Sequence, residues 1–196
     1  LLLLMDRTLL HAAAIDHRGA VNVFSGRKRA GKSTLSIAFG QAGATILAED
    51  HVVLRRAHDG FVLSGCTPRM RVTAETEHAL LKGRLRIDPV DVGGTPKKEF
   101  VADQFFIAQP YIERKPDRLF LTRVKDRVSL RPASASEALL WMIDTTGEGM
   151  RFDNKEGYAS FLDHLSDFVG SVDCYALELS PDISQAARVP ELIAEL

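Results

Sequence analysis

The chain has few cysteines, and their scarcity excludes two kinds of stabilisation. Its 196 residues contain only two, Cys66 and Cys174, which lie far apart and outside any Cys-x-x-Cys pattern. A disulfide framework and a zinc site built on cysteine thiolates are therefore not expected. Two reduced thiols instead favour a cytoplasmic protein.

Excess charge and long apolar stretches are missing as well. The net charge is -1, so composition gives no electrostatic reason to expect a nucleic acid or a membrane surface as partner. No apolar run approaches the roughly 18 residues of a membrane-spanning helix. The segment Leu1–Leu4 is too short for the core of a signal peptide. The first residue is Leu rather than Met, which suggests that an upstream segment is missing.

What remains is an ordinary globular composition, with 45% hydrophobic residues over a length that suits a single domain, 1–196. Near its start, an apolar stretch over 9–15 is β-compatible, and a buried strand is expected over 21–25. A helical pattern begins at Lys32 and stops at Gly43, and a second buried strand follows over 45–48. This order predicts a βαβ unit, in which the strands at 21–25 and 45–48 pair in parallel.

Beyond residue 50 the pattern predicts further strands and helices around an irregular, basic stretch at 65–98. The expected elements are a hairpin of strands 51–56 and 61–64 around Asp59-Gly60, strands at 118–124 and 127–131, a helix capped by Ser136, a helix over 155–169, a strand at 174–179, and a last helix over 184–196 that Pro190 interrupts.

The segment from Gly26 to Ser33 has the sequence GRKRAGKS and matches the phosphate-binding pattern GxxxxGK[ST] in full. Glycines let the backbone curl so that N–H groups point at phosphate oxygens, and the following helix presents its positive end to the same anion. Lys32 is expected to reach the β- and γ-phosphates, and the Ser33 hydroxyl is expected to bind Mg2+. We therefore predict that ATP is bound by Gly26, Arg29, Ala30, Gly31, Lys32, Ser33 and Thr34.

The three cations inside this segment, Arg27, Lys28 and Arg29, occupy positions where small residues are common. They would attract a polyphosphate, but we expect at least two of them to face solvent. Four later cations, Arg69, Arg71, Lys97 and Lys98, are either surface charges or groups that reach the γ-phosphate or the acceptor. Lys97 and Lys98 follow the Gly93-Gly94 pair, which suits a loop that closes over the site.

Two adjacent carboxylates, Glu49 and Asp50, follow the strand at 45–48. If that strand lies beside the one at 21–25, both carboxylates emerge next to the phosphate site. One can then hold Mg2+ while the other acts as general base on an incoming hydroxyl. His11 on its own is more typical of a core residue than of a site residue.

The set LLHAAAI, GRKRAGKSTL and GATILAEDHVVL resembles the catalytic domain of HPr kinase/phosphorylase, and more closely the shorter HPr-kinase-like proteins of bacteria. The resemblance is specific over residues 9–56. It implies an α/β fold of the P-loop kinase type related to phosphoenolpyruvate carboxykinase, with a mixed central sheet flanked by helices. It also implies transfer of the γ-phosphoryl group of ATP, with Mg2+, to a serine hydroxyl of a protein or precursor peptide.

The family pattern maps onto this chain position by position. It implies catalytic roles for His11, Lys32, Glu49 and Asp50, and metal binding by Ser33 and Asp50. The chain departs from the family where Lys28-Arg29 replaces a small Ser-Gly pair and where Glu49 replaces an Asp. A later RGxG stretch is not found in the sequence. These departures argue against HPr itself as substrate and against a reverse phosphorylase activity.

Two other functions stay open on the same fold. A small-molecule kinase would need a concave acceptor pocket, and a nucleotide-dependent switch or ATPase would need a second acidic strand end. The run Leu119–Thr122 ends in Arg123 rather than in an acid, which counts against the switch. The oligomeric state cannot be derived from the chain, although relatives with this fold often form homo-oligomers.

Overall fold

The computed structural model describes residues 7–147 and 155–196, and its centre is a seven-stranded mixed sheet. The order across the sheet is β10 (Ile107–Ala108), β4 (Thr45–Ala48), β2 (Ala12–His17), β3 (Ala20–Ser25), β11 (Arg118–Val124), β13 (Asp173–Leu179) and β12 (Ser129–Pro132). Strand β2 is antiparallel to both β4 and β3, and β13 is antiparallel to β12. The other neighbours, β10 with β4, β3 with β11, and β11 with β13, are parallel. The expected α/β class with a mixed central sheet is confirmed.

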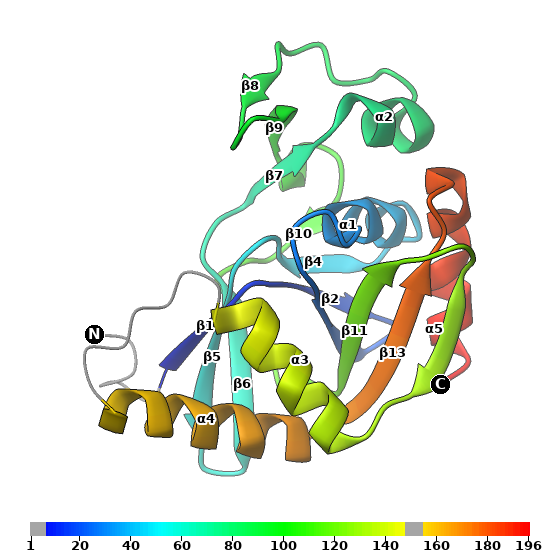
Figure 1. Ribbon diagram of the computed structural model, residues 1–196. Coiled ribbons are helices and arrows are strands. Elements are labelled where there is room, and N and C mark those ends of the chain that lie inside the picture. The colour runs from blue at the N-terminus through cyan, green and yellow to red at the C-terminus, as the bar shows by residue number, and fades with distance from the viewer. Residues whose placement is uncertain (1–6, 148–154) are drawn as a thin grey trace.

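Helices cover both faces of this sheet (Figure 1). One face packs against α1 (Lys32–Gln41) and α5 (Val189–Ala194), and the other against α3 (Ala135–Gly147) and α4 (Lys155–Gly170). The division follows the two-residue period of a strand, because successive side chains point to opposite faces. In β2, for example, Ala13 belongs to the first core and Ala14 to the second. Within the described residues no helix is long and apolar enough to cross a membrane.

The expected parallel pairing of β3 with β4 is wrong, because β2 lies between them. The two-residue turn at Arg18 and Gly19, both with positive φ, joins β2 and β3 into a tight antiparallel hairpin. That hairpin occupies one edge of β3, and β4 pairs with the far edge of β2 instead. The strands β3 and β4 still run in the same direction, so their carboxyl ends emerge on the same side of the sheet.

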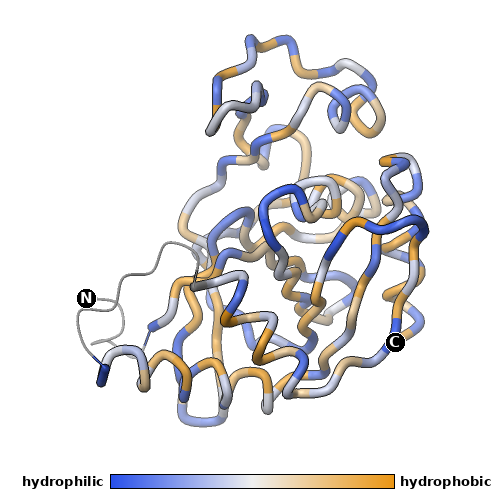
Figure 2. Tube along the Cα trace, viewed as in Figure 1, coloured by the Kyte–Doolittle hydropathy of each residue, from blue (hydrophilic) through white to orange (hydrophobic). Residues whose placement is uncertain are grey.

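The apolar stretch at 9–15 is broken at His11 into β1 (Arg7–Leu10) and β2. Strand β1 leaves the main sheet and pairs with β5 (Val52–Ala57), which forms the predicted hairpin with β6 (Gly60–Gly65). This second sheet packs against α4, where Phe61 meets Phe168 with ring centroids 5.7 Å apart. Hydrophobic and hydrophilic residues alternate along α4 in Figure 2, as its predicted amphipathic pattern requires.

Most of the irregular stretch at 65–98 forms an extension that protrudes beyond α1 at the top of Figure 1. Its packed side contacts Ile37 of α1 through buried residues such as Met70, Leu80 and Phe100. It consists of β7 (Arg69–Val72), α2 (Ala74–Thr76), a π-helical turn (Glu77–Leu81), β8 (Val90–Asp91), β9 (Pro96–Val101) and a 3-10 turn (Ala102–Gln104).

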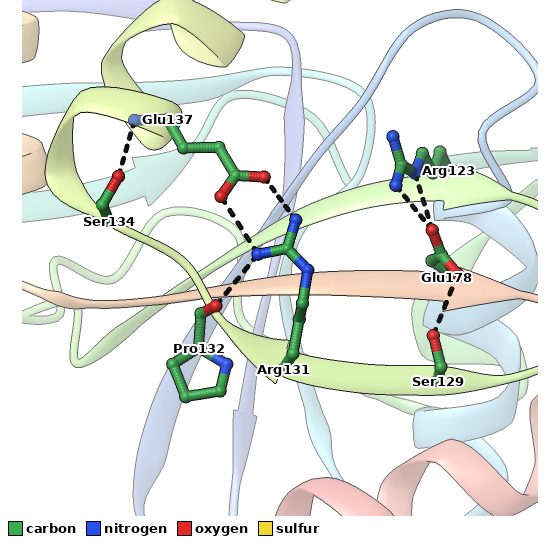
Figure 3. Close-up of polar contacts among 7 residues, drawn as sticks. All are labelled: Arg123, Ser129, Arg131, Pro132, Ser134, Glu137 and Glu178. Atoms are coloured by element: carbon green, nitrogen blue, oxygen red, sulfur yellow. Dashed lines mark hydrogen bonds and ion pairs between the residues drawn. The ribbon is translucent and has the colours of Figure 1, made fainter.

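The expected cap of α3 is corrected by the structure. The backbone N–H of Glu137 donates to the Ser134 hydroxyl at 3.2 Å, so Ser134 rather than Ser136 caps the helix (Figure 3). Nearby, Glu178 of β13 accepts hydrogen bonds from Arg123 of β11 and Ser129 of β12, which ties three strands together.

The last expected helix is also corrected. A 3-10 segment (Ile183–Arg188) precedes α5, and Pro190 stands in the first turn of α5. Its missing N–H costs nothing there, so it starts this helix instead of interrupting one.

Candidate functional site

The segment Gly26–Ser33, here called the glycine-rich loop, connects the end of β3 to the start of α1. Gly31 has φ of 91° and caps α1, and Arg29 has φ of 69°. A Cβ on Gly26 would collide with the backbone oxygen of Thr122, so the close packing of the loop on β11 requires glycine at this position. The loop therefore has the tight turn and the adjoining helix start that the sequence predicts.

Lys32 is buried, and its ammonium points back into the glycine-rich loop. It donates to the carbonyl oxygen of Gly26 at 2.5 Å and to that of Arg27 at 3.3 Å, and it lies 3.0 Å from Nε2 of His11. Burial lowers the pKa of Lys32 to about 8, against the attraction of Asp50 and Glu49. An anion bound in the loop would therefore lie close to the Lys32 ammonium.

The structure separates the two predicted carboxylates. Glu49 is buried, with the Ser33 hydroxyl as hydrogen-bond partner, and burial raises its pKa to about 7. Asp50 is more exposed and lies against the two histidines on either side of it: its carboxylate is 3.3 Å from Nδ1 of His11 and 3.5 Å from Nδ1 of His51. Glu49 is thus hydrogen-bonded to the Ser33 hydroxyl of the loop, whereas Asp50 faces the open part of the site.

His11 connects Asp50 to Lys32 because it stands at the break between β1 and β2. Its Nδ1 lies 3.2 Å from the carbonyl oxygen of Asp50, and since a carbonyl only accepts, Nδ1 carries the proton in this contact. Its Nε2 is then the acceptor for the Lys32 ammonium. Burial and the nearby Lys32 charge lower the pKa of His11, which fits a neutral ring.

Sequence reasoning did not select His51, although it directly follows Asp50 at the end of the strand. That adjacency was the only available signal. His11, Asp50 and His51 each offer a ligand atom within 4.8 Å of the others, a set of nitrogen and oxygen donors suited to a divalent cation. The pair of Ser33 hydroxyl and Glu49 carboxylate offers the oxygen donors that Mg2+ prefers.

A cavity of about 690 Å3 is lined by Lys32, Ser33, His11 and Asp50, but not by Glu49 or His51. Its lining also includes an apolar set: Val124, Leu179, Pro181, Ile183 and Ala186. Sequence reasoning missed this apolar set, because its members come from separate elements and carry no motif. The volume lies in the range of pockets for small ligands.

The three cations inside the glycine-rich loop are all exposed, as expected, but each has a defined contact. Arg27 turns to Asp144 of α3, with Nε 2.7 Å from Oδ2. Lys28 donates to the carbonyl oxygen of Gly93 at 3.3 Å, and Arg29 donates to the Thr95 hydroxyl at 3.2 Å. Lys28 and Arg29 line the cavity, so the loop and the extension meet at its edge.

The predicted ATP-binding residues from Arg29 to Thr34 all line this cavity, whereas Gly26 does not line it and accepts a hydrogen bond from Lys32. Thr34 also contacts the extension, with its hydroxyl 3.3 Å from that of Thr76. The predicted catalytic residues His11, Lys32 and Asp50 line the cavity as well.

Similarity to known proteins is found among solved structures. No protein-family model matches the sequence, and no curated protein matches it. Among solved structures, the chain is similar to the HPr(Ser) kinase/phosphatase from Coxiella burnetii. The TM-score is 0.47 and the sequence identity is 11%, over 96% of this chain and 89% of the other.

Proposed function

We propose that this chain is an ATP- and Mg2+-dependent kinase that transfers the γ-phosphoryl group to a serine hydroxyl of a protein or peptide. One observation carries the proposal. Asp50, a carboxylate suited to remove a proton, lines the same cavity as Lys32 and Ser33 of the glycine-rich loop. A nucleotide switch needs the loop but no such base, whereas transfer to a hydroxyl needs both.

The shape of the cavity supports a nucleotide as the donor. The glycine-rich loop, the start of α1 and Lys32 suit the phosphates, and the apolar lining around Leu179 and Ile183 suits a base. Lys32 would exchange its contacts with Gly26 and Arg27 for the β- and γ-phosphate oxygens. The serine acceptor rests on the resemblance of residues 9–56 to HPr-kinase-like proteins.

Ser33 and a carboxylate would hold Mg2+, which neutralises phosphate charge when bound. The buried Glu49 fits this role, because a divalent cation beside it would favour the ionised form that burial disfavours. Asp50, the Mg2+ ligand that the resemblance implies, is the second candidate for this carboxylate. Its more open position also suits the general base, with His11 orienting its carboxylate.

The test is transfer of label from γ-labelled ATP, with Mg2+, to candidate acceptors, beginning with the peptide or small protein encoded beside this gene. Lys32→Ala and Asp50→Asn are the test variants, and Asp59→Asn on the exposed β5–β6 turn is the control for loss of one negative charge. We expect phosphoserine in the acceptor, loss of transfer with Lys32→Ala, and a roughly 10²–10⁴-fold slower rate with Asp50→Asn.

Phosphoamino-acid analysis of the product distinguishes serine from other acceptors. ATP binding without transfer to any protein or peptide would contradict the proposal and favour a small-molecule acceptor or a nucleotide switch. Full activity of Asp50→Asn would remove Asp50 as the base.

A further inference from the structure

The β8–β9 hairpin brings a lysine to the cavity from outside the main sheet. Its turn contains Gly93 and Gly94, both with positive φ, and it closes with a hydrogen bond from Val92 N–H to the Thr95 carbonyl at 2.9 Å. Lys97 follows this turn and lines the cavity together with Lys32 and Ser33. The extension therefore supplies part of the cavity wall.

The strand pleat separates Lys97 from its neighbour Lys98, because adjacent side chains of a strand point to opposite faces. Lys98 faces the packed side of the extension, where it donates to the Leu85 carbonyl at 2.6 Å and lies 3.4 Å from Glu77. It is a structural cation. Lys97 faces the cavity, and it is half-buried.

The other predicted cations of the extension are engaged by a carboxylate. Arg69 and Arg71 both bind Glu99, with Arg71 Nε 2.7 Å from Oε2. Lys97 differs: among residues 7–147 and 155–196, its ammonium has no hydrogen-bond or ion-pair partner. Of the four cations that the sequence offered for the γ-phosphate, Lys97 is thus the one whose charge is uncommitted.

The charge of Lys97 acts on the centre of the site. Burial is the main cause of the lowered pKa of Lys32 and of the raised pKa of Glu49, and the charge of Lys97 adds to the first shift and opposes the second. Lys97 and Lys32 repel each other across the cavity, and an anion between them would relieve that repulsion. The contacts of Lys28 with Gly93 and of Arg29 with Thr95 hold the hairpin tip against the loop.

We propose that Lys97 contacts the terminal phosphate of ATP, so that the β8–β9 hairpin distinguishes a nucleoside triphosphate from a diphosphate. The inference rests on one part of the proposed function, namely that ATP binds in the glycine-rich loop. During transfer the bond between the γ-phosphorus and the bridging oxygen breaks, and ADP leaves with its electron pair. The acceptor oxygen bonds to phosphorus, and its proton passes to Asp50. Lys97 stabilises charge on the phosphoryl oxygens throughout.

The test compares affinities for the non-hydrolysable β,γ-imido analogue of ATP and for ADP, both with Mg2+, by calorimetry on the full chain. We expect Lys97→Met to weaken the analogue roughly 10–100-fold, the effect of losing one charge-assisted hydrogen bond, and to weaken ADP less than about threefold. Lys98→Met is the matched control: it should lower the melting temperature but leave the ratio of the two affinities unchanged.

Circular dichroism and melting curves are the control for correct folding of each variant. Lys97→Gln provides a second test of the lost charge. Equal weakening of both nucleotides, or no weakening of the analogue, would overturn the inference. If the wild type discriminates through Lys97 but phosphorylates no acceptor, the inference stands and the proposed kinase function fails. A wild type that binds neither nucleotide overturns both.

Discussion

Glu49→Gln is the substitution whose effect on stability can be worked out from the site. The carboxyl is buried, and its pKa rises from 4.5 to about 7. The folded protein therefore keeps the proton to higher pH than the unfolded chain, so stability is lost as pH rises from about 4.5 to about 7. The full shift corresponds to about 3 kcal/mol. Gln keeps the shape and the oxygen acceptor for Ser33 but does not titrate.

The expected result is a difference that grows with pH. Relative to the wild type, Glu49→Gln should gain about 2 kcal/mol of unfolding free energy between pH 5 and pH 8, because roughly a third of the cost is already present at pH 5. Urea denaturation at several pH values measures it, with Asp59→Asn as the control for charge removal. A difference that stays constant from pH 5 to pH 8 would refute the idea that Glu49 is a strained buried acid.

Three further predictions test other parts of the site and fold. Ser134→Ala should cost about 1 kcal/mol of unfolding free energy, since it removes the cap of α3, whereas Ser136→Ala should change stability by less than about 0.5 kcal/mol; equal effects in thermal melts would contradict the assigned cap. Gly26→Ala should lose nucleotide binding and about 1–3 kcal/mol of stability, because its Cβ meets Thr122, while Gly170→Ala, which meets nothing within 4 Å, serves as control. ATP affinity should fall toward tenfold per pH unit above about pH 8, as free Lys32 loses its proton, and a flat binding profile up to pH 9.5 would show that Lys32 does not hold the phosphates.

Local patterns predicted the part of the site that depends on local structure. The change from strand to helix periodicity located the glycine-rich loop, and Gly43, with φ of 81°, follows the end of α1 as expected. His11, the one polar residue within the apolar stretch at 9–15, stands where that stretch breaks. These features depend on backbone geometry over a few residues, which the sequence specifies directly.

Longer-range features could not be derived in this way. Strand β2 lies between β3 and β4 because its hairpin with β3 takes the edge of β3 that faces β4, and no residue of β4 signals this arrangement. The apolar lining of the cavity combines residues around 124 and 179–186, and Lys97 differs from Lys98 only through the register of β9. Membership of the HPr-kinase-like family and the roles of the site residues stay predictions.

The backbone at Asp50 restricts which acids can serve at this position. Asp50 has φ of 73°, a left-handed conformation that Asp, Asn and Gly adopt far more readily than other residues do. Position 49 lacks this constraint, so the longer glutamate side chain is tolerated there. A library of variants at position 50 should therefore fold best with Asn and Gly, both without a base. Among natural residues, Asp alone combines an ionisable carboxylate with this turn at little conformational cost, so the proposed general base and the local backbone geometry call for the same residue.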